Sequence, residues 1–174
     1  MTALGTHFTT TADGRLALRF DRTFAHPPKK VWRALTEAEH LRHWFPAAVD
    51  FDLTPGAKVR FEIRTDAKQH YDIPDDQAIS YGEVIAVEAP HLLEYAWEEE
   101  ILRWELQTGG KDGCRLIFTH VLDRTYTTPA ASEVAAGWHV GFEMLTAQLD
   151  GQAIQRSPWE RQAQILTDYA QSFG

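Results

Sequence analysis

The sequence predicts an α+β fold in which a curved antiparallel sheet wraps around one long helix near the C-terminus. Apolar and polar side chains alternate through most of residues 49–122, the pattern of strands with one buried face. Residues 131–149 instead carry an apolar stripe at helical spacing. Because each element needs to bury its apolar side, a sheet packed on this helix satisfies both.

The N-terminal part predicts one strand and a pair of short helices. Residues 15–24 alternate as a strand does, and Pro27-Pro28 then ends the strand and favours the start of a first helix. A second helix is expected with Thr36 as its N-cap and Glu39 completing a capping box. Pro46 ends this helix pair.

The middle of the chain predicts a meander of antiparallel strands joined by short turns. A polar loop is expected at residues 65–80, a charged hairpin tip at 98–100 and a glycine-rich hairpin at 109–113. The strands are expected around residues 49–53, 59–63, 81–87, 93–97, 102–106 and 116–120.

Two helices are predicted after the sheet. The stripe of the long helix is formed by Val134, Trp138, Phe142, Leu145 and Leu149. Gly151 is a typical stop, and Ser157-Pro158 starts a tail helix that runs to about Tyr169. We therefore expect one domain over residues 1–151 and a tail over 152–174. The tail could pack on this domain or across a homodimer.

Composition and charge exclude several classes of protein. The 174 residues are 44% hydrophobic and 24% charged, which fits a single globular domain. The net charge is −8 and no basic stripe is present, so a nucleic-acid partner is not expected. No apolar run is long enough to insert in a membrane, and the first residues do not resemble a signal peptide. With a single cysteine, Cys114, these features predict a cytoplasmic protein.

Several segments together resemble one known family. They are Val31-Trp32-Arg33-Ala34-Leu35-Thr36, Leu41-Arg42-His43-Trp44-Phe45, Leu53-Thr54-Pro55-Gly56, Gly82-Glu83-Val84-Ile85-Ala86-Val87, Pro90 with Leu93-Glu94-Tyr95-Ala96-Trp97, Cys114-Arg115-Leu116-Ile117-Phe118-Thr119-His120, and Gly137-Trp138. In this order, over roughly residues 14–150, they resemble the Hsp90-ATPase-activator-like branch of the START/Bet v 1-like (SRPBCC) helix-grip superfamily. Ala57, where the family often has glycine, and the long loop at 65–80 depart from the family pattern.

The resemblance implies a helix-grip fold: a curved antiparallel sheet around a long C-terminal helix, with a short helix pair after the first strand. It also implies an apolar cavity for a small hydrophobic or amphipathic molecule, and it implies no cofactor. It supplies no reaction, because one fold can carry many functions.

Aromatic side chains are the main candidates for the wall of such a cavity. The chain has six Trp, nine Phe and five Tyr, and an apolar wall with a few polar tips is typical of a ligand site. The alternative is that these side chains pack on one another as an ordinary core. The predicted cavity residues are Trp44, Phe61, Tyr95, Trp97, Trp104, Phe118, His120, Trp138 and Phe142.

His120 is the candidate with the most chemistry. It shares the inward register of the last strand with Leu116 and Phe118, where an imidazole could orient a ligand or act as a general base. The alternative is a structural histidine at the end of a strand, bonded to a backbone carbonyl.

Other polar clusters give no site. His40 and His43 could share a metal with Glu37 or Glu39, but no recognised metal-binding spacing is present, so we predict no metal. The acidic residues of the 65–80 loop, with His70, are expected to form a hydrated rim. Cys114 has no evident activating base and no nucleophile elbow occurs.

Three functions remain open from the sequence. The first is the binding of a small hydrophobic or amphipathic molecule. The second is a polyketide cyclase, dehydratase or hydrolase reaction that uses His120. The third, suggested only by the family name, is a chaperone-associated regulatory module.

Overall fold

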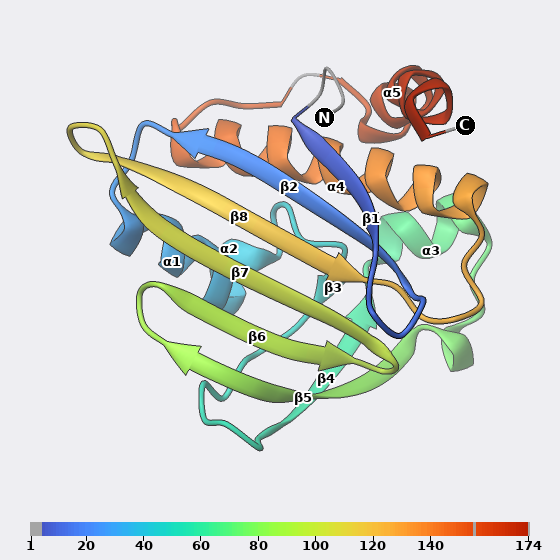
Figure 1. Ribbon diagram of the computed structural model, residues 1–174, viewed down its shortest axis with the longest axis horizontal. Coiled ribbons are helices and arrows are strands. Elements are labelled where there is room, and N and C mark those ends of the chain that lie inside the picture. Colours follow the sequence, from blue (N-terminus) through green and yellow to red (C-terminus); the bar gives the residue numbers. More distant parts are fainter. Residues whose placement is uncertain (1–4, 155, 174) are drawn as a thin grey trace.

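The α+β fold is confirmed by the computed structural model, which describes residues 5–154 and 156–173 (Figure 1). One open, fully antiparallel sheet has the strand order β1-β2-β8-β7-β6-β5-β4-β3. Its strands are β1 (Thr6–Thr10), β2 (Leu16–Phe24), β3 (Ala47–Ala48), β4 (Lys58–Ile63), β5 (Ile79–Glu88), β6 (Leu92–Trp97), β7 (Glu100–Gly109) and β8 (Gly113–Val121).

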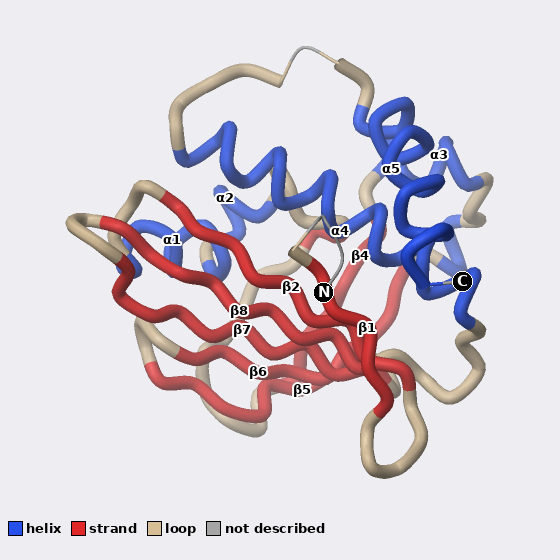
Figure 2. Tube along the Cα trace, turned by 45° about the horizontal axis from the view of Figure 1, so that its top comes forward, coloured by secondary structure: helices blue, strands red, loops and turns tan. Residues whose placement is uncertain are grey.

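Most helices lie beside one long helix that crosses a face of the sheet (Figure 2). The helices are α1 (Pro28–Thr36), α2 (Ala38–Leu41), α3 (Thr65–Tyr71), the single 3₁₀ turn η1 (Asp75–Gln77), α4 (Thr128–Leu149) and α5 (Pro158–Phe173). Helices α1 and α2 lie near one end of α4, while α3 and α5 lie side by side near its other end (Figures 1 and 2). None of the described helices combines the length and apolar character needed to cross a membrane.

The predicted end of the long helix is confirmed. Gly151 has a φ of 68°, a left-handed conformation that glycine adopts without a steric penalty. Its N–H donates to the carbonyl of Gln148 at 3.1 Å, and the N–H of Gln152 donates to that of Ala147 at 2.8 Å. These two bonds form a Schellman motif, which satisfies carbonyls that the helix end would leave unpaired.

Two of the predicted elements are wrong, and one strand near the N-terminus is missing from the prediction. Residues 6–10 form β1, which pairs with β2 as a hairpin, although no strand is predicted there. Residues 49–53 form no strand. The two residues of β3 before them pair with β4, and the chain then leaves the sheet. Residues 65–80 are not a loop: they hold α3, η1 and the start of β5.

The predicted capping box at the second helix is also wrong. Thr36 belongs to α1, where its hydroxyl donates to the carbonyl of Trp32 at 2.8 Å. Glu37 is the N-cap of α2 and makes no side-chain capping bond. The hydroxyl of Thr36 bonds back into its own helix, so it cannot serve the next one.

The space between α4 and the middle of the sheet is filled by aromatic rings. Trp104 stacks on Phe118 with ring centroids 3.9 Å apart, and Phe118 meets Trp138 edge-on at 4.7 Å. Tyr95 is buried and its hydroxyl accepts a hydrogen bond from the Trp104 indole at 3.2 Å. Burial raises the pKa of Tyr95 far above its ordinary range. This part of the interior is therefore a packed core.

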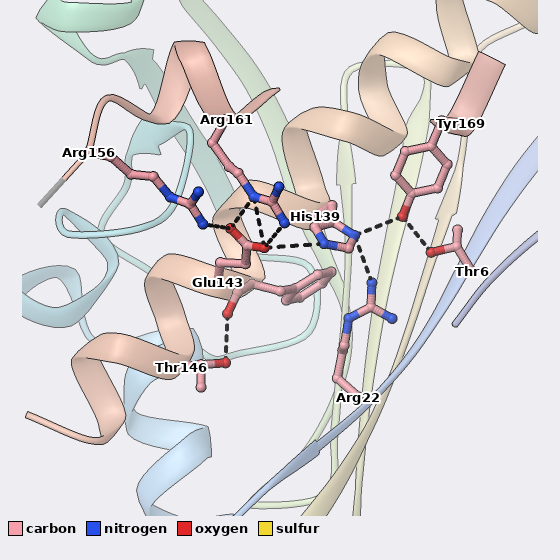
Figure 3. Close-up of polar contacts among 9 residues, drawn as sticks. Thr6, Arg22, His139, Glu143, Thr146, Arg156, Arg161 and Tyr169 are labelled. Carbon is pink, nitrogen blue, oxygen red and sulfur yellow. Dashed lines mark hydrogen bonds and ion pairs between the residues drawn. The ribbon is translucent and has the colours of Figure 1, made fainter. Parts of the chain in front are cut away.

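Helix α5 is fastened to α4 and to the first two strands by a partly buried polar network (Figure 3). Arg161 of α5 binds the Glu143 carboxylate of α4 through both of its oxygens, with contacts of 2.7 to 3.2 Å. Tyr169 lies 3.1 Å from Nδ1 of His139 and 2.7 Å from the hydroxyl of Thr6. This network holds one side of the pocket described next.

Candidate functional site

A pocket of about 860 Å³ opens beside the middle of α4, along Glu133 to Met144. It lies between α4, α3 and α5, and its floor is formed by residues at the ends of β4 to β8. Most of its wall is apolar, with a few polar side chains, as in small-molecule sites.

Small residues on the helices leave this space open. Gly137 and Gly141 of α4 and Ala163 of α5 all face the pocket, where larger side chains would fill it. A Cβ built on Gly137 meets nothing closer than 3.8 Å, the Gln162 side chain. The glycine at 137 therefore provides room rather than a special backbone conformation.

Helices α3 and α5 meet across one side of the pocket. The ring of His70 lies flat on Trp159, with centroids 4.2 Å apart and planes 7° from parallel. Tyr71 meets the same indole edge-on at 5.5 Å, and its hydroxyl accepts a hydrogen bond from Gln162 at 3.0 Å. Two segments far apart in the sequence thus enclose the pocket together.

The structure divides the nine predicted cavity residues into two groups. Four contribute to the pocket wall: Trp44, Trp97, His120 and Trp138. The other five lie in the packed core behind it, with exposed fractions of 2% or less: Phe61, Tyr95, Trp104, Phe118 and Phe142. Phe61 still supports the wall, because it stacks on Trp97 at 4.3 Å.

A chain of hydrogen bonds connects the core to the pocket wall through His120. The indole N–H of Trp138 donates to Nδ1 of His120 at 2.9 Å. The other ring nitrogen, Nε2, is in close contact with the carboxylate of Glu100. The hydroxyl group of Tyr126 lies beside the same carboxylate and interacts with it.

This geometry fixes the tautomer of His120. Because Nδ1 accepts the hydrogen of Trp138, it carries no hydrogen itself, and the ring hydrogen lies on Nε2. Nε2 then donates to Glu100. Both ring nitrogens of His120 are therefore engaged with the protein, and the expected bond to a backbone carbonyl is not made.

Burial and the neighbouring carboxylate act together on Tyr126. Desolvation is the larger effect and the charge and hydrogen bond of Glu100 add to it, which raises the pKa of Tyr126 to about 12. Tyr126 is therefore a protonated donor at neutral pH. The group that presents acceptor oxygens to the pocket is Glu100, which a hydrogen bond from His120 holds in place.

Sequence reasoning missed Glu100 as a site residue and placed it at a hairpin tip. A signal was present, since Leu102, Trp104 and Leu106 face inward and the period of two puts residue 100 on the same face. Tyr126 and the walls from α3 and α5 gave no comparable signal. Tyr126 lies in an irregular segment between β8 and α4, and α3 and α5 are far apart in the sequence. Only the folded chain brings them to the pocket.

Asp66 and His70 of the predicted rim line this pocket, whereas His40, His43 and Cys114 lie apart from it. Nε2 of His40 is 3.3 Å from the Glu37 carboxylate, and His43 is exposed. Within residues 5–154 and 156–173, no three His, Cys, Asp or Glu side chains are grouped as a metal would require. Cys114 is fully buried, and burial raises the pKa of its thiol to about 11.

Comparison with known families decides the relationship that the fold suggests. Residues 25–150 match the profile described as "Activator of Hsp90 ATPase homolog 1-like protein". This chain belongs to the Activator of Hsp90 ATPase homolog 1-like family. The match includes the helix pair, the sheet from β3 to β8 and α4, while α5 lies beyond it.

Solved structures share the fold of this member of the Activator of Hsp90 ATPase homolog 1-like family. A conserved protein of unknown function from Enterococcus faecalis is 20% identical, with a TM-score of 0.74 over 98% of this chain and 91% of that one. A Bordetella parapertussis protein is 24% identical, with a TM-score of 0.69 over 98% and 93%. CalU16 from Micromonospora echinospora is 20% identical, with a TM-score of 0.68 over 97% and 92%. The comparison with curated proteins found no match.

Proposed function

We propose that this protein binds a small, largely apolar molecule in the pocket between α3, α4 and α5. The observation that carries the proposal is the pocket itself: about 860 Å³, an aromatic and aliphatic wall, and one hydrogen-bonded carboxylate at its floor. The volume lies within the usual range for small-molecule sites. The family match and the related folds are consistent with this use of the interior.

The polar groups of the wall support a ligand with one polar end. Trp97 donates its indole hydrogen to Ser80 at 2.7 Å, so this polar pair is satisfied within the protein. Glu100 keeps acceptor capacity after it binds His120, because a carboxylate has about four lone-pair sites. A ligand would bury its apolar body against the rings and place its polar end at Glu100.

Binding can be tested by isothermal titration calorimetry with a panel of tricyclic and acyl compounds. Four Trp side chains line the pocket, so Trp fluorescence should change along the same titration curve. A negative change in heat capacity on binding is expected, because apolar surface is removed from water. Failure of the whole panel to bind, with the protein folded, would overturn the proposal.

A second candidate is proton transfer between Glu100 and a bound ligand. It is favoured by the position of this carboxylate in the wall of a largely apolar pocket, where a hydrogen bond from His120 holds it in place for general-base work. His120 itself is not suited, since both of its nitrogens are engaged. The test is deuterium uptake at the carbon next to the carbonyl of 2-tetralone in D₂O. Equal uptake rates with wild type and Glu100→Gln would exclude this candidate.

A further inference from the structure

The charged side chains in the pocket wall are mostly acidic. Asp66, Glu98, Glu100 and Glu133 contribute carboxylates to it, whereas Arg64 is its single Arg or Lys among the residues the structure describes. Arg64 is itself bound to Asp66 at 3.2 Å. The wall therefore has an excess of negative charge.

None of the remaining three carboxylates is paired with an Arg or Lys in the part of the chain that the structure describes. Across residues 5–154 and 156–173, no Arg or Lys forms an ion pair with Glu98, Glu100 or Glu133. The chain as a whole carries a net charge of −8, so the long-range field has the same sign. An anionic ligand would meet repulsion here, and a cation would be attracted.

Glu100 is the carboxylate best placed to hold a cationic group. Its side chain is 19% exposed, so its interactions are less screened than those of surface carboxylates. His120 donates a hydrogen to it and Tyr126 lies beside it, which fixes its position. Charge-assisted hydrogen bonds of this kind are stronger than those between neutral groups.

Aromatic rings surround the same part of the pocket. Trp97 is the cross-strand partner of Glu100, and Trp138 lies on the other side of His120. Trp97 stacks on Phe61 and Phe45, and a ring face that is left to the pocket attracts cations, ammonium groups included. Rings and carboxylate thus favour the same kind of head group.

We propose that the pocket takes an amphipathic amine, with its protonated amino group on Glu100 and its apolar body against the aromatic wall. This inference rests on the proposed function and adds the charge of the ligand to it. The amine hydrogens donate to the free lone pairs of Glu100, and no bond is made or broken.

Three compounds with one apolar body test the charge preference. Dehydroabietylamine, dehydroabietol and dehydroabietic acid share a tricyclic body and carry a cationic, a neutral and an anionic head at pH 7. Calorimetry with the full chain should give an affinity for the amine at least tenfold above that for the alcohol. The acid should bind more weakly than the alcohol.

Variants assign the preference to Glu100. Glu100→Gln keeps a carbonyl oxygen for His120 and should reduce the advantage of the amine over the alcohol to below threefold, with the alcohol affinity little changed. Glu105→Gln removes the same charge from the outward side of the same strand and should leave the preference intact. Thermal melts establish that both variants fold.

The possible failures can be told apart. If the alcohol binds but the amine has no advantage, the charge inference is overturned while the proposed function stands. If none of the three compounds binds, the proposed function itself fails. An amine preference that persists in Glu100→Gln would also overturn the assignment, because a general attraction to the acidic protein would then explain it.

Discussion

The indole nitrogen of Trp138 lies 2.9 Å from Nδ1 of His120 and donates its hydrogen there. Trp138 belongs to α4 and His120 to β8, so this bond joins the long helix to the sheet. It also decides which ring nitrogen faces Glu100, and thereby how the carboxylate is held at the pocket floor.

Trp138→Phe removes this hydrogen-bond donor and keeps an aromatic ring in its place. Because Nδ1 of the buried His120 is then left without its partner, we expect the free energy of unfolding to fall by about 1–3 kcal/mol. Any loss of packing from the smaller ring adds to this value. Urea denaturation measures the loss. Trp159→Phe is the control, since that indole stacks on His70 but donates no hydrogen bond in the described structure. Equal losses in the two variants would contradict this role.

Gly137→Leu places a side chain in the pocket. Its Cβ has room, and leucine favours a helix interior over glycine by roughly 0.5–1 kcal/mol, so the fold should be kept. Ligand affinity should fall by at least tenfold in calorimetry, because the added atoms occupy ligand space. Thr146→Leu adds the same side chain at an exposed position of α4 and should bind normally. Normal binding by Gly137→Leu would place the ligand elsewhere.

Gly82→Ala tests the close approach of β5 and β6. A Cβ at this position would lie 1.8 Å from the carbonyl oxygen of Ala96, a backbone atom that cannot move without disturbing the strand pair. We expect a loss of about 3 kcal/mol or more in unfolding free energy. Gly109 of β7 is the control. A Cβ there would lie 3.4 Å from its nearest neighbour, the backbone nitrogen of Arg115, so Gly109→Ala should be tolerated. Similar stabilities of the two variants would contradict the geometry.

His139 should make stability depend on pH. In the folded protein the pKa of His139 lies below its ordinary value of 6.5. Burial is the main cause, and the positive charge of the nearby Arg22 adds to it. Arg161 of α5 also opposes protonation and Glu143 favours it, while the Tyr169 hydroxyl is hydrogen-bonded to the ring. The unfolded chain therefore binds the proton more readily, and stability is lost as the pH falls from about 6.5 toward the folded pKa.

The measurement is urea unfolding at a series of pH values between 7.5 and 5, roughly the range in which histidine titrates. His139→Gln should show a smaller loss of stability on acidification than wild type. His43→Gln, at an exposed position, should keep the wild-type slope. If His139→Gln followed the wild-type curve, the depressed pKa would not be a source of the pH dependence.

Cys114 should react slowly with thiol reagents in the native protein. It is fully buried at the start of β8, and burial raises its pKa to about 11, so little reactive thiolate exists at pH 8. Labelling with Ellman's reagent should become fast only in denaturant. Rapid labelling of the native protein would show that this strand opens.

Much of the fold follows from patterns that are local in the sequence. The alternation in β4 to β8 and the stripe on α4 repeat often enough to identify each element and its buried face. The pattern at 49–53 failed because alternating apolar residues can also be buried by a loop: Phe51 packs on Tyr95 at 4.8 Å without strand pairing. Helix α3 was missed because seven residues give too few turns for a period to be recognised.

The sequence by itself determined the fold class, the inward faces and the presence of His120 among aromatic neighbours. Only the tertiary structure decided which rings fill a core and which line a pocket, because that depends on how α3 and α5 close over α4. It also decided that Glu100, and not His120, presents its free acceptor atoms to a ligand. The hydrogen bond from Trp138 to His120 and the position of Tyr126 beside Glu100 set that arrangement, and these residues, 18 and 6 positions from His120, come together only in the folded chain.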